Sequence, residues 1–339
     1  MISLIIPVYN DKDYIGQCLN SIFKCNFKKQ FEVIVVDDGS SDGLAKIVVS
    51  FPCRLISTGK NSGPGAARNL GAELAKGDIL AFVDSDCVVS ENWLSIIDNI
   101  FFDEKIKAIA GRFSRNLNPE FIARYRYYEA SFYALNEKTF VNTFTASSFA
   151  CRRKLFLEVG GFGTRPAGEE ITLGYRLYKK GVNILCVPEF VVAHHCLRTL
   201  RGYLKQQFIW MKHFFILCQL YPEMVYFRGL LRKSNLTSQL VLQVVLMLSI
   251  IILLMNNKTM LPIVLVLIFF FCLFLLNFAF LRYIRKKEKK YFLMLQSIFV
   301  IFMRNCVWIA AILCGIKVKR LIPFAHCFFK KQLLELRLS

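Results

Sequence analysis

Two aspartates near residue 85 have the spacing that a divalent cation needs. Asp84 and Asp86 are separated by one residue and follow a short apolar run, so on an extended segment both carboxylates point the same way. Mg²⁺ and Mn²⁺ prefer oxygen ligands and keep their remaining positions for water or phosphate. The alternative is a pair of solvated aspartates at a strand end. We expect a Mg²⁺ or Mn²⁺ site here.

Three further polar clusters also follow apolar runs. They are PVYND at 7–11, DDGSSD at 37–42 and NSGPGAARN at 61–69. The carboxyl ends of parallel strands meet at one edge of a sheet, where ligands bind in such folds, so we expect all four clusters to converge. Each cluster alone has an ordinary alternative, because Asp, Gly and Ser also dominate turns and helix caps. Their joint occurrence favours a binding site.

The strands and helices that must position these clusters are visible in the hydrophobic pattern. Buried strands are predicted at 2–7, 31–36, 53–57, 79–83 and 106–110, and amphipathic helices at 14–23, 66–76 and 93–101. Alternating strands and helices are typical of an α/β sheet with right-handed crossovers. We expect one catalytic domain over residues 1–197.

The predicted site suits a reaction in which a nucleoside diphosphate departs. The chain has no GxxxxGK[ST] loop and no GxGxxG after its first strand, which disfavours nucleotide hydrolysis and dinucleotide-dependent dehydrogenation. Carboxylates with a divalent cation stabilise charge on a departing diphosphate. Aspartates at the first strands can hold a nucleoside through base N–H and ribose hydroxyl groups. We therefore expect a nucleotide-sugar donor.

The order and spacing of six motifs resemble glycosyltransferase family 2, which comprises inverting enzymes of GT-A fold. The motifs are PVYN, VVDDGSSD, NSGPGAARN, GDILAFVDSD, GGF and GEEITLGYRL, over about residues 1–200. The resemblance implies a Rossmann-like GT-A domain. It also implies a nucleotide-sugar site made of Pro7, Tyr9, Asn10, Asp37, Asp38, Arg68, Asp84, Ser85 and Glu169.

The resemblance also implies a metal site and a catalytic base. Asp84 and Asp86 match the metal-binding DxD motif, with Asp86 as the direct ligand. His194 lies where similar enzymes often have a histidine that completes the metal or diphosphate site; the neighbouring His195 and a purely structural histidine are the alternatives. The family commonly has an acidic pair after GGF, and the second member here is Glu170. Glu170 is therefore the expected base, one methylene longer than the usual aspartate.

The excess basic charge lies in the second part of the chain. The sequence holds 44 Lys and Arg against 24 Asp and Glu, a net charge of +20, of which residues 1–200 carry only +3. The nearly balanced first part argues against a nucleic-acid partner. A basic, aromatic helical region at 198–234 suits a membrane interface. Residues 235–339 are predicted as a membrane region with spans at about 236–255 and 260–281.

The basic flanks of these spans indicate the orientation. They place the N-terminal domain in the cytoplasm of an integral membrane protein, expected in a bacterial plasma membrane. A third apolar segment, 291–315, is long enough to span, but Arg304 lies near its middle and six basic residues follow it. We favour a re-entrant or membrane-lying hairpin over a third span.

These features predict a metal-dependent, inverting glycosyltransferase. The expected donor is a UDP-sugar, and the expected acceptor is a membrane lipid, a lipid-linked sugar or a surface-glycan precursor. A processive polysaccharide synthase is one alternative; Gln206 and Trp210 match its QxxRW motif, but Ile209 replaces the arginine. A catalytically silent membrane scaffold is the other, favoured only by the glutamate at position 170.

Overall fold

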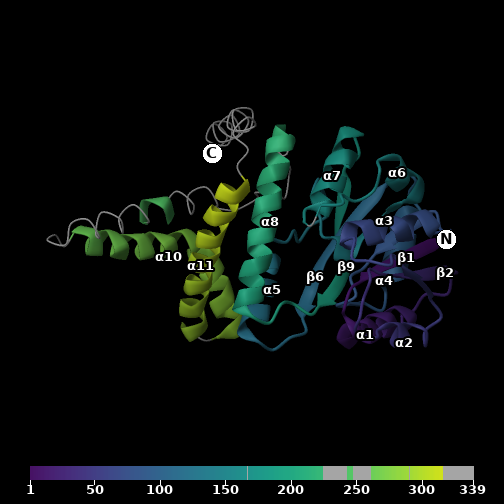
Figure 1. Ribbon diagram of the computed structural model, residues 1–339, viewed down its shortest axis with the longest axis horizontal. Coiled ribbons are helices and arrows are strands. Elements are labelled where there is room, and N and C mark those ends of the chain that lie inside the picture. The colour runs from purple at the N-terminus through teal and green to yellow at the C-terminus, as the bar shows by residue number, and fades with distance from the viewer. Residues whose placement is uncertain (166, 224–242, 247–260, 290, 316–339) are drawn as a thin grey trace.

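The computed structural model describes residues 1–165, 167–223, 243–246, 261–289 and 291–315 (Figure 1). A sheet domain that contains the N-terminus lies at one end of the molecule, and helices of the C-terminal part lie at the other. The two parts meet along α5 (Phe121–Tyr133) and α8 (Leu200–Leu220), which stand between the sheet and α11 (Tyr291–Gly315).

The first four strands form the parallel half of one sheet, as the sequence predicts. β1 (Ile2–Val8) lies between β2 (Phe31–Asp37) and β4 (Ile79–Phe82), and β3 (Arg54–Ser57) lies outside β2. The prediction of a buried strand at 53–57 is wrong on burial, because β3 lies at the edge of the sheet and none of its residues is buried. All seven residues of β1 are buried, which is typical of a strand with helices over both faces. The four polar clusters therefore leave the sheet along one edge.

Helices cover both faces of this half. One face carries α1 (Lys12–Phe23), α2 (Ala45–Val48) and α4 (Trp93–Phe101), and the other carries α3 (Pro64–Leu74), α6 (Arg153–Glu158) and α7 (Glu169–Lys179). Because successive strand residues point to opposite faces, Leu4 and Ile6 pack in the first core and Ile5 in the second. The three predicted helices correspond to α1, α3 and α4.

The second half of the sheet is mixed, which the sequence does not predict. β8 (Phe149–Arg152) runs antiparallel between β4 and β6 (Ala108–Asn116), after a short 3₁₀ turn (Ala146–Ser148). β9 (Ile184–His194) is parallel to β6, and β5 (Cys87–Val89) and β7 (Thr139–Val141) are antiparallel to β9. The strand predicted at 106–110 corresponds to β6, which extends further, to Asn116. The four-residue strand β8, which is too short to show a hydrophobic period, lies between β6 and β4.

Two C-terminal helices are long and apolar enough to cross a membrane by length and composition. They are Val266–Glu288, within α10 (Leu261–Glu288), and α11. α10 contains nearly all of the predicted span 260–281, whereas the span at 236–255 lies outside the described residues except for 243–246. α11 is unbroken, so 291–315 contains no internal turn of the kind that a hairpin needs. Its path relative to a membrane stays a prediction.

A buried ion pair attaches α11 to the sheet domain. Arg304, near the middle of α11, lies with Nη1 2.5 Å from Oε1 of Glu129 on α5. The Tyr203 hydroxyl of α8 donates to the same carboxylate at 3.2 Å. Trp308 of α11 donates to Gln207 of α8 at 3.1 Å. The arginine that argues against a third span therefore has a carboxylate partner in the N-terminal part of the chain.

Replacement of Arg304 by methionine should lower the free energy of unfolding by about 3–5 kcal/mol, because it leaves the Glu129 carboxylate buried without its partner. Adding Glu129→Gln should recover much of the loss, since no uncompensated charge remains. Urea unfolding of the full chain in neutral detergent, followed by circular dichroism, measures both effects. The control Lys29→Gln breaks an exposed pair with Asp98 and should cost less than about 1 kcal/mol. An Arg304→Met variant as stable as this control contradicts the prediction.

Candidate active site

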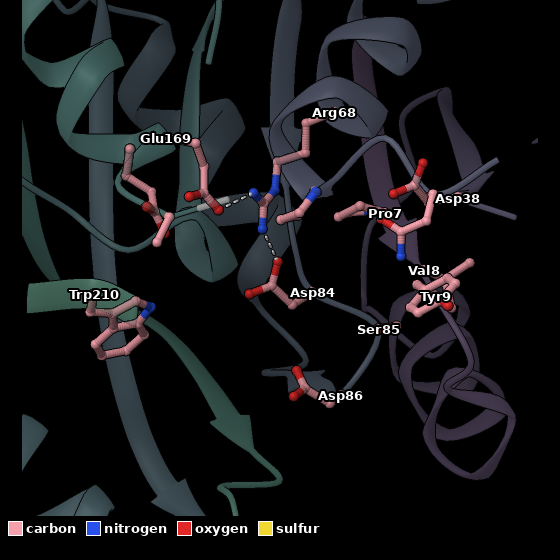
Figure 2. A pocket seen from close by; sticks show the side chains of 14 residues that line it. Pro7, Val8, Tyr9, Asp38, Arg68, Asp84, Ser85, Asp86, Glu169 and Trp210 are labelled. Atoms are coloured by element: carbon pink, nitrogen blue, oxygen red, sulfur yellow. Dashed lines mark hydrogen bonds and ion pairs between the residues drawn. The ribbon is translucent and has the colours of Figure 1, made fainter. Parts of the chain in front are cut away.

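The four polar clusters converge on one cavity at the carboxyl edge of the parallel strands (Figure 2). Its volume is about 390 Å³, and its walls come from the loops after β1, β2, β3 and β4, the N-terminal parts of α3 and α7, and one side chain of α8. Nine predicted site residues line it: Pro7, Tyr9, Asp38, Arg68, Asp84, Ser85, Asp86, Glu169 and Glu170. Asn10, Asp37 and His194 do not.

A buried arginine fixes two of the predicted carboxylates. Arg68 of α3 is 4% exposed; its Nη2 lies 2.6 Å from Oδ1 of Asp84, and its Nη1 lies 3.2 Å from Oε1 of Glu169 (Figure 2). Burial favours a lower pKa for Arg68, but Asp84, Glu169 and Glu170 outweigh it and hold the pKa above its ordinary value. The guanidinium stays charged, and Asp84 and Glu169 each have one oxygen engaged.

The motif around Arg68 is shaped to bring α3 against the segment after GGF. A Cβ at Gly65 would overlap the carbonyl oxygen of Gly163, so only glycine allows this approach. Asn69 donates to the Phe162 carbonyl at 3.1 Å and accepts from the Phe162 N–H at 2.9 Å. Residues 65–69 and 162–163 are therefore held together, although they are about a hundred positions apart in the sequence.

Asp38, Asn10 and Asp37 organise the loops at the other end of the cavity. Asp38 is buried and accepts hydrogen bonds from the backbone of Ser62 at 2.9 Å and Gly63 at 2.7 Å. Asn10 has a φ of 50°, which asparagine tolerates better than most residues, and its side-chain oxygen accepts from the loop after β2. Asp37 accepts a bond from within its own turn. Of the three, only Asp38 reaches the cavity.

Asp86 and His194 form a second charged pair, apart from Arg68. Asp86 follows β4 and His194 ends β9, with 3.1 Å between Oδ2 and Nε2. Burial favours a higher pKa for Asp86, but His194 outweighs it and lowers the pKa. Burial favours a lower pKa for His194, but Asp86 raises it to about 10. His195 lies elsewhere, stacked on Tyr14 at 4.4 Å between ring centroids.

This pair offers the ligands that a hard divalent cation needs. Together with Cys87, Asp86 and His194 form the group of potential metal ligands found close together among the described residues. Burial raises the pKa of the Cys87 thiol well above its usual range, so the thiol is protonated in the absence of a metal ion. The Asp86 carboxylate is the oxygen donor that Mg²⁺ and Mn²⁺ prefer. His194 must first release its proton, and while protonated it can balance phosphate charge.

Glu170 has no ion-pair partner in the part of the chain that the structure describes. It stands beside Glu169 in the first turn of α7, after Gly168 in the left-handed region at a φ of 81°. Burial and the charge of Glu169 raise the pKa of Glu170 to about 8, while Arg68 opposes the shift. Glu170 also lines a smaller cavity of about 210 Å³ that contains Asp86. It is the carboxyl group free to exchange a proton there.

Besides Val8, Asn61, Pro64 and Ala167, which also line the cavity, Trp210 and Asp11 lie at the site without having been predicted. Trp210 of α8 lines the cavity and, in Figure 2, lies across Asp84 from Asp38. Asp11 accepts a hydrogen bond from the Ser85 hydroxyl at 2.5 Å, and burial raises the pKa of Asp11 to about 6. Asp11 thereby orients the loop of the DxD motif. Both residues stand in motifs that the sequence shows, but their types alone do not single them out.

Comparison with known proteins finds a family match in the N-terminal part of the chain. Residues 3–160 match the family model described as Glycosyl transferase family 2. The chain is 40% identical over 99 residues to Glycosyltransferase AglE of Haloferax volcanii, a match that covers 27% of this chain and 33% of that protein. It is 28% identical over 218 residues to the Pre-mycofactocin glycosyltransferase of Mycobacterium tuberculosis, covering 61% of this chain and 45% of the relative. The chain spans less than half the length of these curated relatives.

A solved structure has the same fold. The mannosyltransferase PcManGT from Pyrobaculum calidifontis, in complex with GDP-Man and Mn²⁺, superposes with a TM-score of 0.50 at 20% identity, covering 63% of this chain and 61% of that one. The mixed α/β sheet is therefore a GT-A-like domain, as the sequence predicts.

Infrared spectra of the metal-free chain should contain a carboxyl band that titrates near pH 8, because Glu170 is protonated below its raised pKa. Glu170→Gln should remove this band. Arg68→Gln should move it to higher pH, since Arg68 is the charge that favours the Glu170 carboxylate. The control Glu137→Gln alters an exposed glutamate and should leave the band in place. An unchanged band in Glu170→Gln refutes the assignment.

Proposed function

Because residues 3–160 form a glycosyl transferase family 2 domain, we propose that the chain is an inverting, metal-dependent glycosyltransferase. It moves one sugar from a nucleotide donor, which we take to be a UDP-sugar, to a membrane-associated acceptor. The acceptor is a lipid-linked sugar or another precursor of a surface glycan. The observation that carries the proposal is one cavity lined by both Asp86, which lies near His194, and Glu170, which has no ion pair with any residue that the structure describes.

The proposed reaction is a single displacement. Glu170 takes the proton of the acceptor hydroxyl while the oxygen of that hydroxyl attacks C1 of the donor sugar. The bond from C1 to the diphosphate oxygen breaks, so the configuration at C1 is inverted and the nucleoside diphosphate leaves. Asp86 would hold a Mg²⁺ or Mn²⁺ ion, which would stabilise negative charge on that leaving group. Protonated His194 adds positive charge on the same side.

The other residues hold the reactants. Pro7, Tyr9 and Asp38 lie at the end of the cavity where the first strands finish, which suits the nucleoside. Arg68 keeps Asp84 and Glu169 in fixed positions and thereby sets the distance between the metal side and the base side. The bound GDP-Man and Mn²⁺ of the similar mannosyltransferase support a nucleotide-sugar donor and a divalent cation.

We further propose that the chain is an integral membrane protein with its catalytic domain in the cytoplasm, in a bacterial plasma membrane. Large apolar side chains of α10 and α11 are exposed, among them Leu267, Phe271 and Phe292. Such a surface is costly in water and suits lipid. The last turn of α10 carries three basic residues, Arg285, Lys286 and Lys287. Basic residues of this kind favour the cytoplasmic, anionic leaflet.

Asp86→Asn should lower turnover by about 10² or more, the loss typical of one preorganised charge stabiliser. The cause is a weakened cation site beside His194. Release of the nucleoside diphosphate by the full chain, with a panel of nucleotide sugars and Mn²⁺, measures it. Asp98→Asn, at a partly exposed ion pair far from the cavity, is the matched control. Wild-type turnover in excess EDTA would falsify the metal requirement.

Glu170→Gln should lower turnover by about 10²–10⁴, the usual contribution of a general base. In the wild type, kcat/KM should rise with pH through a limb at or below about 8, because Glu170 must lose its proton to act and a bound cation lowers its pKa. Glu158→Gln, at a surface ion pair, is the control. A Glu170→Gln variant that binds donor and retains full transfer points to another base; absence of both donor binding and transfer in the wild type favours a silent scaffold.

A further inference from the structure

A second cavity adjoins the candidate active site on the side away from Asp38. Its volume is about 460 Å³, and it lies between β6, α5 and α8. Trp210 lines this cavity, the smaller cavity that holds Glu170, and the main cavity. Phe113 and Arg126 line both this second cavity and the smaller cavity beside Glu170. A continuous set of walls therefore leads from the proposed base into this second space, which we call the arginine cavity.

Two arginines give the arginine cavity its charge. Arg112 donates from Nε to the Pro188 carbonyl at 3.0 Å and from Nη1 to Asn136 at 2.5 Å. Both partners are uncharged, and Arg112 has no ion pair with any described residue. The Arg112 guanidinium is therefore held in place by neutral groups, which do not compensate its positive charge.

Arg126 is only weakly compensated. Its Nη1 lies 3.8 Å from Oε2 of Glu129, beyond hydrogen-bond distance, whereas Oε1 of Glu129 binds Arg304 at 2.5 Å. Two guanidinium groups thus share one carboxylate, and Arg304 has the closer contact. Arg126 is left with positive charge at the cavity wall, with its side chain 18% exposed.

The backbone beside Arg112 is shaped for this position. The pairing of β6 with β9 shifts register between Ala110 and Arg112, and such bulges re-aim side chains. A Cβ on Gly111 would overlap the Phe190 carbonyl oxygen, so the chain needs glycine at this point. The irregularity that brings Arg112 to the cavity is therefore built into the packing of the sheet.

Trp210 links the arginines to the reaction centre. The Arg126 guanidinium lies 5.1 Å from the centroid of the indole ring, and Trp210 is 42% exposed. An exposed indole offers a flat face to a sugar ring or an apolar chain. The adjacent wall is largely apolar, with Tyr133, Leu135 and Phe144.

We propose that the arginine cavity is the acceptor subsite and that it binds a phosphate group carried by the acceptor, with Arg112 and Arg126 as its ligands and Trp210 as the platform between phosphate and reacting hydroxyl. Guanidinium groups bind phosphate with strong, directional hydrogen bonds. In the proposed function, the cation site at Asp86 neutralises the donor diphosphate. Arg112 and Arg126 are not needed for that charge, so they can bind a different anion. This inference rests on the proposed function and narrows its acceptor to a phosphate-bearing molecule.

Calorimetric titration of the full chain in the neutral detergent digitonin tests the subsite without requiring catalysis. The probes are dodecyl phosphate, the uncharged 1-O-dodecylglycerol and inorganic phosphate. We expect dodecyl phosphate to bind at least tenfold more tightly than dodecylglycerol. Arg126→Gln and Arg112→Gln should each weaken dodecyl phosphate binding by about tenfold, the loss of one charged hydrogen-bond partner. Arg126→Lys should retain part of it, and Arg54→Gln, an exposed arginine on β3, should bind like the wild type.

The three probes separate the sources of the phosphate. Binding of dodecyl phosphate alone supports a lipid-linked acceptor, and equal binding of inorganic phosphate supports a water-soluble phosphate-bearing acceptor. Equal binding of dodecyl phosphate and dodecylglycerol by the wild type overturns the proposal, as does unchanged binding in both glutamine variants. Sugar transfer measured on the same samples separates the two hypotheses. Transfer without arginine-dependent binding refutes the subsite alone, and arginine-dependent binding without transfer to any acceptor refutes the proposed function.

Discussion

The contact on which the site depends is the buried guanidinium of Arg68 between two carboxylates from distant parts of the chain. It joins α3, the loop after β4 and the start of α7 at one point. A cation at that depth is stable only with such partners, and the partners are fixed by it in turn. Each acidic pair is thereby divided, because Asp84 and Glu169 form ion pairs with the arginine, whereas Asp86 pairs with His194 and Glu170 has no ion pair with any described residue.

Much of this site follows from the sequence, for identifiable reasons. The apolar runs of β1, β2 and β4 are largely buried and end in polar clusters, so their parallel order predicts the convergence around Asp38, Asp84 and Asp86. β8 carries no such pattern, and its place in the sheet is set by long-range pairing. Asp84 and Asp86 also differ through tertiary contacts, since Asp84 pairs with Arg68 and Asp86 with His194. Their spacing in the sequence does not distinguish them.

Arg304 shows the limit of hydropathy as a guide. In the sequence it interrupts an apolar segment and argues against a membrane span, because an isolated cation in lipid is costly. In the structure its partner Glu129 comes from α5, 175 positions earlier. Sequence separation of that size leaves no local signal. The same carboxylate also governs how much charge Arg126 presents, so one ion pair affects both the attachment of α11 and the electrostatics beside Trp210.

α8 connects these regions as one continuous helix. One of its side chains, Trp210, lines the reaction cavity, while Gln207 and Gln219 of the same helix are hydrogen-bonded to α11. α8 is continuous over the 21 residues that include these contacts. The shape of the cavity at Trp210 and the packing of the C-terminal helix α11 therefore share one structural element.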